Sequence, residues 1–185
     1  MKTKITVVRV TDWNRVLNAA RMTVHKARIE KEPTDAFKKS ILMAEHSPIR
    51  LLEYDIIVED IPYYSAMHFA RHFLGVEKFV ATEREDRTGV KREDRKQTDL
   101  VNLQLSTNAQ SLINISRKRL CACADAITRS VWRDTVEALR ETDPLVAARC
   151  VPECIYRGFC PEGDKCCGYC HTKDFEEKLK EYRSL

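Results

Sequence analysis

The stretch HFARHFLGVEKFVATEREDR, residues 68–87, gathers the side chains in this sequence that are best suited to chemistry. It begins with the pattern of an amphipathic helix and ends as a charged loop. On one helix, His68 and His72 would lie on the same face, with Arg71 beside them. Half of a zinc-protease helix motif has this spacing, but Phe69 stands where that motif needs a glutamate base. The residues therefore argue against catalytic zinc, and a half-buried histidine pair with satisfied ring nitrogens is the structural alternative.

The loop that follows is rich in charge of both signs. Arginines outnumber lysines by five to two between positions 71 and 95, and six acidic residues are interspersed. Such mixing is unlike a polybasic arm that binds nucleic acid. Guanidinium groups bind phosphate through two parallel hydrogen bonds. Two interpretations stay open: a solvated loop, or a site for a mononucleotide or phosphorylated metabolite.

A second polar pattern lies in STNAQSLINISRKRL, residues 106–120. Asn108 can cap a helix here, and Leu112 and Ile113 point towards packing. Asn114 and Arg119 are polar residues on a helix that is otherwise suited to burial. The basic end of this helix would complement its dipole on a plain surface helix. A polar stripe facing a ligand is the equal alternative.

The C-terminal tail holds six of the eight cysteines: Cys150, Cys154, Cys160, Cys166, Cys167 and Cys170. Four thiolates can bind zinc tetrahedrally, and glycine turns let a short chain wrap the ion. Only the last two cysteines have C-x2-C spacing. Structural zinc on a subset of the six, an iron–sulfur cluster, and free or disulfide-linked thiols all remain open. Cys121 and Cys123 are expected to pack in the core.

Length and composition fit one soluble domain, or one domain with a small appendage. The chain has 185 residues, of which 43% are hydrophobic and 32% charged, so it can form a packed core. A net charge of +4 is too balanced for an obligate nucleic-acid binder. No apolar run reaches about 18 residues, and no signal-peptide core is present. We expect a cytoplasmic protein that does not bind membranes and whose cysteines are mostly reduced.

The expected elements follow from hydrophobic periodicity and caps. Strands are expected at 4–10 and 50–60, and helices at 13–24, 33–43, 61–73, 108–120, 125–140 and 173–185. Residues 75–98 are expected to form a long loop, and residues 150–170 a turn-rich segment. A domain over 1–145 and a Cys-rich tail over 146–185 with a short terminal helix complete the expected organisation.

Taken in order, three segments resemble the flavin-dependent thymidylate synthases, which methylate dUMP using FAD, NADPH and methylenetetrahydrofolate. EHSPIRLLEYDI resembles their small hydroxyl residue, proline and strand; HFARHF resembles the start of their RHR signature; and TNAQSLINISRKRLCACADAITR is similar to their Asn-Ala helix. The resemblance covers about residues 3–142 and is patchy from 74 to 105. It implies an α+β fold with a central antiparallel sheet flanked by helices. It also implies a homotetramer with sites between subunits.

Carried over residue by residue, the resemblance implies two adjoining sites. The FAD site would comprise Ser47, Arg71, His72, Asn108, Ala109, Gln110 and Asn114. The site for dUMP or a related pyrimidine nucleotide would comprise His68, Arg71, Thr82, Arg84, Arg87 and Arg119. Arg119 would be catalytic, because a guanidinium beside the uracil ring stabilises charge developing on N3 and O4. Arg87, Arg92 or Arg95 would replace a phosphate contact that the family makes from a helical insert.

The sequence also departs from the family's pattern. Phe73 replaces the second arginine of the signature, VEKFVATER lacks its Asn-Glu pair, and the helical insert is largely absent. Besides dUMP methylation, two readings therefore stay open. One is a diverged enzyme that acts on another pyrimidine nucleotide or delivers a hydroxymethyl group. The other is a protein without turnover, either a flavin or nucleotide binder or a zinc-tailed interaction protein.

Overall fold

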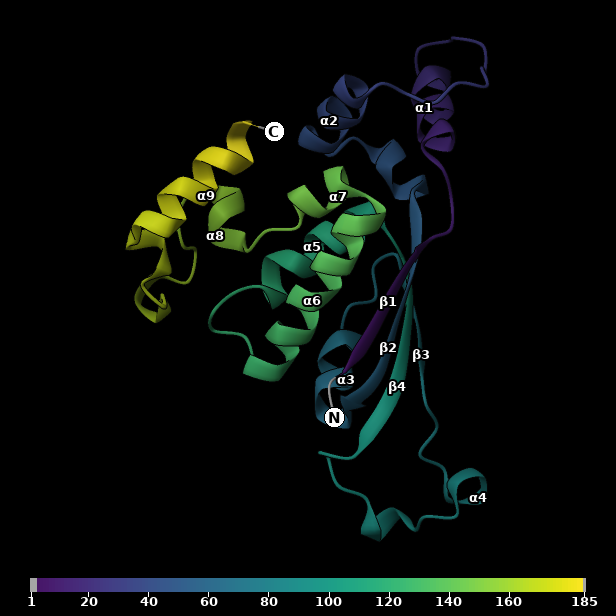
Figure 1. Ribbon diagram of the computed structural model, residues 1–185, viewed down its shortest axis with the longest axis vertical. Helices are drawn as coiled ribbons and strands as arrows, with labels where there is room; N and C mark the ends of the chain where they lie inside the picture. The colour runs from purple at the N-terminus through teal and green to yellow at the C-terminus, as the bar shows by residue number, and fades with distance from the viewer. Residues whose placement is uncertain (1–2, 185) are drawn as a thin grey trace.

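The computed structural model describes residues 3–184, and its framework is a four-stranded antiparallel sheet with strand order β1-β2-β4-β3. The strands are β1 (Lys4–Arg9), β2 (Glu53–Pro62), β3 (Val76–Val80) and β4 (Leu100–Asn108). Helices lie against one face of the sheet (Figure 1). This arrangement confirms the expected α+β fold and both expected strands.

Two strands were missing from the sequence-based expectation. Residues 75–98 do not form one continuous loop, because β3 occupies their start and pairs with β4, with Val76 opposite Thr107. In β4, Val101, Leu103, Leu105 and Thr107 are buried and alternate with more exposed residues. This period of two is the normal sign of a half-buried strand. Strand β4 lies between a charged loop and the sequence that caps α5, and these flanking segments obscured its alternating pattern.

The helices around the sheet are α1 (Trp13–Met22), α2 (Asp35–Met43), α3 (Tyr63–Ala70), α5 (Ala109–Arg119), α6 (Ala126–Thr142) and α7 (Pro144–Arg149), and the short turn η1 spans Ser47–Leu51. Five begin at a residue whose side chain accepts a hydrogen bond from the first turn: Asp12, Thr34, Asn108, Asp125 and Asp143. Such caps satisfy otherwise unpaired backbone N–H groups. The expected helices between residues 13 and 140 are thus confirmed in type and approximate position, except that the one expected at 61–73 is shorter. Among residues 3–184, no helix has the length and apolar character needed to cross a membrane.

Helix α3 ends earlier than expected. It stops at Ala70, and the backbone N–H of His72 donates to the carbonyl of Phe69 at 3.0 Å in a final turn. The chain then passes through Gly75, whose φ is +68°. His68 and His72 therefore do not share one helix face, although Arg119 contacts the His72 ring and the backbone carbonyl of His68.

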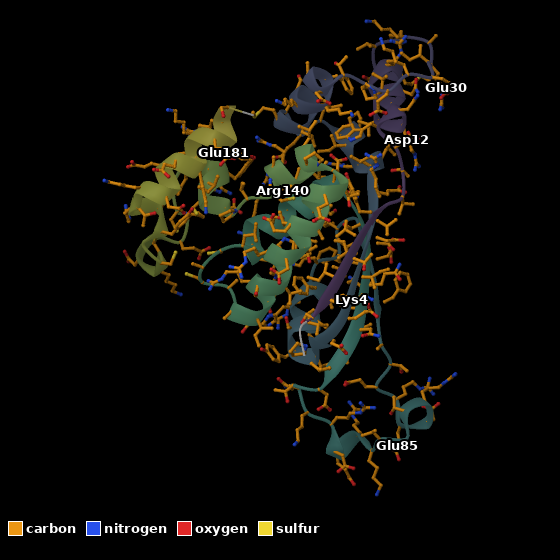
Figure 2. All side chains as sticks on the ribbon, viewed as in Figure 1. Lys4, Asp12, Glu30, Glu85, Arg140 and Glu181 are labelled. Atoms are coloured by element: carbon orange, nitrogen blue, oxygen red, sulfur yellow. The ribbon has the colours of Figure 1, made fainter. Side chains whose placement is uncertain are left out.

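A short helix and a turn project from the far end of the sheet. They are α4 (Glu85–Thr88) and η2 (Arg92–Asp94), in the connection from β3 to β4. Glu85 lies at one end of the molecule and Asp12 near the other (Figure 2). The connection therefore extends away from the helical layer.

The tail forms an outer layer against α5 and α6 (Figure 1). It contains α8 (Glu153–Arg157), the turns η3 (Gly163–Lys165) and η4 (Tyr169–His171), and α9 (Lys173–Ser184). This confirms the expected turn-rich segment and terminal helix. The main core continues through Val146 to Cys150, and a separate small cluster is formed around Ile155, Phe175 and Tyr182.

A buried carboxylate ties the edge of the sheet to the helices. Asp143 is 3% exposed, and its Oδ2 accepts from Trp13 Nε1 at 2.8 Å and from Tyr54 Oη at 3.0 Å. Arg9 lies 3.5 Å from the same oxygen. Burial, followed by the charge of Asp143, raises the pKa of Tyr54, so its hydroxyl remains a donor. One side chain thus joins β1, α1 and β2, and it also caps α7.

We predict that Asp143→Ala lowers the free energy of unfolding by about 3–5 kcal/mol, because buried donors and Arg9 lose their only shared acceptor. Urea denaturation at pH 7 measures the change. Asp134→Ala is the matched control, since the Asp134 carboxylate is half exposed and lies 4.0 Å from Arg133. It should change stability by less than about 0.5 kcal/mol. Equal effects in the two variants would contradict the assignment.

Candidate functional site

Arg119, at the C-terminal end of α5, makes a polar node with the turn after α3. Its Nε donates to His72 Nε2 at 2.9 Å, and its terminal NH2 group donates to the backbone carbonyl of His68 at 2.6 Å. The guanidinium of an arginine has about five N–H donors, and these two hydrogen bonds use two of them. The node fixes the direction of the Arg119 side chain and leaves further N–H groups to bind a ligand.

A chain of hydrogen bonds holds His68 from the other side. The hydroxyl of Thr128 donates to Asp125 Oδ1 at 2.8 Å, so it can only accept from its other neighbours. Those neighbours are the Ser65 hydroxyl and His68 Nδ1, each at 2.9 Å. His68 therefore carries its proton on Nδ1 and presents Nε2 as an acceptor. The hydrogen bonds from Thr128 lower the pKa of Asp125, which keeps this carboxylate charged.

His72 is held in its neutral form. Burial, then the charges of Arg119 and Lys78, lowers the pKa of His72 to about 4. A neutral ring can accept from Arg119 through Nε2, whereas a protonated ring could not. Burial and the nearby Arg71 also lower the pKa of Arg119. The Arg119 guanidinium is thus a partly desolvated positive charge, and neutral groups hold it in position.

The segment after α3 is held tightly on the start of α5. Ser111 Oγ donates to the Leu74 carbonyl at 2.7 Å, and Thr107 Oγ1 donates to the Gly75 carbonyl at 3.0 Å. A Cβ at Gly75 would lie 2.5 Å from Asn108 Nδ2, so only glycine fits. As a result, Arg71, Phe73 and Leu74 face solvent, the latter two at 72% and 75% exposure.

The other residues expected at the FAD site lie along α5 and at η1. Gln110 Nε2 donates to Glu45 at 2.6 Å, and Arg117 pairs with the same carboxylate and with Asn114 at 3.1 Å. Ser47 is exposed at the start of η1. Ala109 is fully buried, and Asn108 serves as the cap of α5 through a 3.0 Å bond from the Ser111 N–H.

The loop residues expected at the nucleotide site lie elsewhere in this chain. Thr82, Arg84 and Arg87 are exposed on the β3–β4 connection. Arg84 forms a bidentate pair with Asp86 at 2.9 and 3.0 Å. This connection lies at the end of the molecule that is remote from the C-terminal end of α5 (Figures 1 and 2). The structure therefore brings His68, Arg71, His72 and Arg119 together, and it does not bring Thr82, Arg84 or Arg87 to them.

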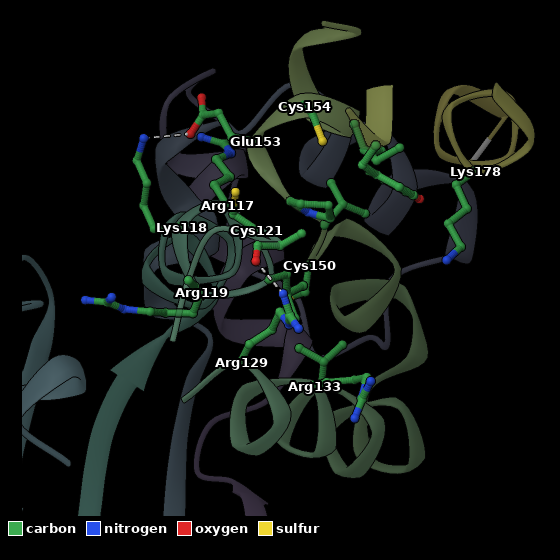
Figure 3. A pocket seen from close by; sticks show the side chains of 18 of the residues that line it. Arg117, Lys118, Arg119, Cys121, Arg129, Arg133, Cys150, Glu153, Cys154 and Lys178 are labelled. Atoms are coloured by element: carbon green, nitrogen blue, oxygen red, sulfur yellow. Dashed lines mark hydrogen bonds and ion pairs between the residues drawn. The ribbon is translucent and has the colours of Figure 1, made fainter. Parts of the chain in front are cut away.

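A cavity lies on the opposite side of the end of α5. It has a volume of about 860 Å³ and is bounded by α5, α6 and the tail. Arg119 contributes to its rim, but the guanidinium points away from the cysteines (Figure 3). Cys121 and Cys123 also border this cavity, and Cys123 is exposed. The expectation that Cys123 packs in the core is therefore wrong, because α5 ends before it and leaves it in the connection to α6.

Sequence reasoning missed several residues that shape the site. Thr128 and Asp125 orient His68, Glu45 binds the polar face of α5, and Lys78 donates to the His72 carbonyl at 3.2 Å. The only available signal was for Asp125, which was recognised as a helix start. The others are ordinary polar residues whose partners are distant in sequence.

Comparisons with known proteins place the fold. No protein-family model matches the sequence, and no curated protein matches it. Solved structures do match. A flavin-dependent thymidylate synthase ThyX from Helicobacter pylori, complexed with FAD and dUMP, has a TM-score of 0.64 at 13% identity over 79% of this chain and 99% of that chain. The chain has the flavin-dependent thymidylate synthase fold.

A second neighbour with this fold is the UMP/dUMP methylase PolB from Streptomyces cacaoi, bound with 5-Br dUMP. It has a TM-score of 0.63 at 12% identity, over 85% of this chain and 96% of that chain. Nearly the whole of each neighbour is covered, while about a fifth of this chain has no counterpart in the thymidylate synthase. The thymidylate synthase fold thus accounts for most of the chain and leaves a remainder about the size of the tail.

We predict that neutral His72 makes stability depend on pH. Its folded pKa of about 4 lies below the usual value of 6.5, so its contribution is complete above pH 6.5 and is lost as pH falls towards 4. After allowance for its partial exposure, the loss is roughly 1–2 kcal/mol. His72→Gln keeps an acceptor for Arg119 and should remove that part of the pH dependence in urea titrations between pH 7 and 4.

His46→Gln, at an exposed position outside the node, is the control and should keep the wild-type pH dependence. An unchanged dependence in His72→Gln would show that His72 is not held neutral by Arg119.

Proposed function

We propose that this chain is an FAD-dependent enzyme of the thymidylate synthase type, which methylates dUMP reductively to dTMP. Methylenetetrahydrofolate would supply the one-carbon unit and NADPH the reducing equivalents. The observation that carries the proposal is the Arg119 node in a chain with this fold. The two named neighbours, one complexed with dUMP and the other bound with 5-Br dUMP, support the choice of a pyrimidine nucleotide.

In this mechanism Arg119 acts on the uracil ring. Addition at one side of the ring places negative charge on N3 and O4, and a guanidinium directed at that edge lowers the energy of the charged transition state. Neutral His72 and the carbonyl of His68 hold the guanidinium in position without neutralising it. His68 Nε2 is left free to accept from the nucleotide, because Nδ1 is engaged with Thr128. Preorganisation of this kind avoids a reorganisation cost during the reaction.

The residues expected around FAD fit a flat, phosphate-bearing cofactor. Arg71 offers an exposed guanidinium, and the exposed Phe73 and Leu74 beside it offer apolar surface for a ring system. The cradle at Gly75, which a Cβ would fill, brings this segment against Asn108 and Ser111. Bound FAD would supply the hydride-transfer chemistry. Ser47, Gln110 and Asn114 would provide hydrogen bonds at the cofactor's other edge.

The nucleotide site would be completed by a second copy of the chain. Thr82, Arg84 and Arg87 lie on a projecting connection that does not reach Arg119 of its own chain (Figure 1). A symmetric oligomer would place this connection from one copy beside the node of another. This supports the homotetramer with shared sites that the resemblance implies.

A second candidate is methylation or hydroxymethylation of another pyrimidine nucleotide. The PolB neighbour, described as a UMP/dUMP methylase, favours it. So does Phe73, which is 72% exposed where the signature has a second arginine. Tritium release from 5-labelled dUMP and 5-labelled UMP, measured in parallel, separates the two, because any substitution at C5 must remove that hydrogen. Product mass then distinguishes methyl from hydroxymethyl.

We predict that Arg119→Ala lowers tritium release from 5-labelled dUMP by about a hundredfold or more, because one preorganised donor in a dry site contributes that much to the rate. The flavin absorbance of the purified variant should remain. Arg133→Ala is the matched control, since Arg133 is an exposed arginine on α6 outside the node. It should retain wild-type turnover, and full activity in Arg119→Ala would refute the mechanism.

We also predict complementation between inactive variants. Arg84→Ala and Arg119→Ala should each be inactive alone, but a mixture co-refolded in equal amounts should recover about a quarter of the activity, as random assortment into shared sites requires. A mixture of His72→Ala and Arg119→Ala should recover none, because both changes lie in the same node of one chain. Failure of the first mixture to recover would exclude a site shared in this way.

A further inference from the structure

The cysteines of this chain converge on one place. All eight border the cavity between the end of α5, α6 and the tail: Cys121, Cys123, Cys150, Cys154, Cys160, Cys166, Cys167 and Cys170. The tail is seated there by pairs with α5, including Lys118 with Glu153 at 3.3 Å and the Arg117 guanidinium 3.5 Å from the centre of the Tyr156 ring. Figure 3 shows Cys121 and Cys154 in this region, with Cys150 deeper between the helices.

One subset of these side chains has the spacing of metal ligands. Atoms of Cys166, Cys170 and His171 that can ligate a metal all lie within 4.8 Å of one another. The two thiol sulfurs are 3.5 Å apart. In a tetrahedral zinc site with Zn–S bonds of about 2.3 Å, neighbouring sulfurs are separated by roughly 3.8 Å. The group is therefore close to the size that zinc needs.

The fourth ligand can come from Cys160, a half-buried cysteine that precedes Cys166 by six residues and borders the same cavity. The atoms that lie within 4.8 Å of one another belong to Cys166, Cys170 and His171, and metal binding would draw the Cys160 thiol to them. Two glycines with positive φ, Gly163 at 54° and Gly168 at 81°, turn the short chain between and after these cysteines. The N–H of Gly168 donates to Cys166 Sγ at 3.3 Å, a bond that stabilises a thiolate bound to metal.

We propose that Cys160, Cys166, Cys170 and His171 bind a structural zinc ion. Of the six tail cysteines, Cys150 is excluded because it is 5% exposed and belongs to the main core. Cys167 is exposed and does not belong to the group of ligand atoms within 4.8 Å of one another. Cys154 packs against the small apolar cluster of Ile155, Phe175 and Tyr182. This site is independent of the proposed catalytic function.

Zinc fits these ligands better than an iron–sulfur cluster does. The thiolates of a cluster bind different iron atoms and must surround a body of several atoms, whereas the ligand atoms of Cys166, Cys170 and His171 all lie within 4.8 Å of one another. The tail also needs such a staple. Its own apolar cluster has only Ile155, Phe175 and Tyr182 buried, which is too little to fold a segment of this length alone. Metal binding would supply that folding energy.

The zinc site would also shape the cavity. Cys160, Cys166 and Cys170 form part of its wall. Cys123 Sγ donates to the Lys165 carbonyl at 3.7 Å, which joins the turn η3 to the connection between α5 and α6. Removing the metal should therefore loosen the outer wall, while the sheet and α5 keep their own core.

The test is elemental analysis of full-length protein purified under reducing conditions and dialysed against a weak chelator. We expect about one zinc ion per chain and neither iron nor sulfide. Cys166→Ser and His171→Ala should lose this zinc, whereas Cys167→Ser, which changes the adjacent cysteine, should retain it. Circular dichroism confirms that the variants keep the folded main domain.

Cobalt substitution gives a second readout that does not require a variant. Protein loaded with Co²⁺ should show the visible bands of a tetrahedral thiolate site, and His171→Ala should shift them. Iron with sulfide, a Cys166–Cys170 disulfide without metal, or equal zinc loss in Cys166→Ser and Cys167→Ser would each overturn the proposal.

Discussion

The direct joint between β4 and α5 constrains most of this structure. The strand ends at Asn108 and the helix begins at Ala109, with no loop between them. Ala109 is fully buried, and its N–H donates to the Leu52 carbonyl at 2.9 Å. The start of α5 therefore contacts the residue that directly precedes β2. Any larger side chain here would force the helix off the sheet. Because the joint is rigid, the direction of α5 and the position of its far end are set by the sheet.

The last turn of α5 contains three consecutive basic residues, and each of them contacts a different part of the molecule. Arg117 pairs with Glu45, Lys118 with Glu153 of the tail, and Arg119 with His68 and His72. Positive charge at a helix C-terminus is favoured by the helix dipole, so this turn is basic at little cost. The three side chains diverge because successive residues of a helix are about 100° apart. One turn therefore supports η1, the tail and the candidate site.

The sequence predicted what depends on local pattern. Caps at Asp12 and Asn108, the strand at 50–60 and the terminal helix follow from periodicity and short-range hydrogen bonds. The prominence of Arg119 came from the family resemblance. Strand β3 was lost in a charged segment, because its pairing with β4 depends on contacts distant in sequence.

Side-chain partnerships at long sequence separation were also beyond prediction. Thr128 binds His68 across 60 residues, and Glu45 binds Gln110 across 65. Neither pair belongs to a recognisable local motif. The same holds for the approach of Cys121 and Cys123 to the tail cysteines, since it depends on how α8 docks on α5. Such contacts follow from the packed fold and not from the residues around each partner.

The residues of the candidate site differ in how strongly they indicate a function. Asn108 and Gly75 match what the fold itself needs, a helix cap and a close backbone approach, so their presence follows from structure alone. Arg119 is different. A half-buried guanidinium beside Arg71, with a histidine held neutral against it, costs electrostatic free energy and joins no acid in the node. Perturbed groups that the fold does not need are the ones that function maintains. This costly arrangement is the strongest structural reason to expect chemistry there.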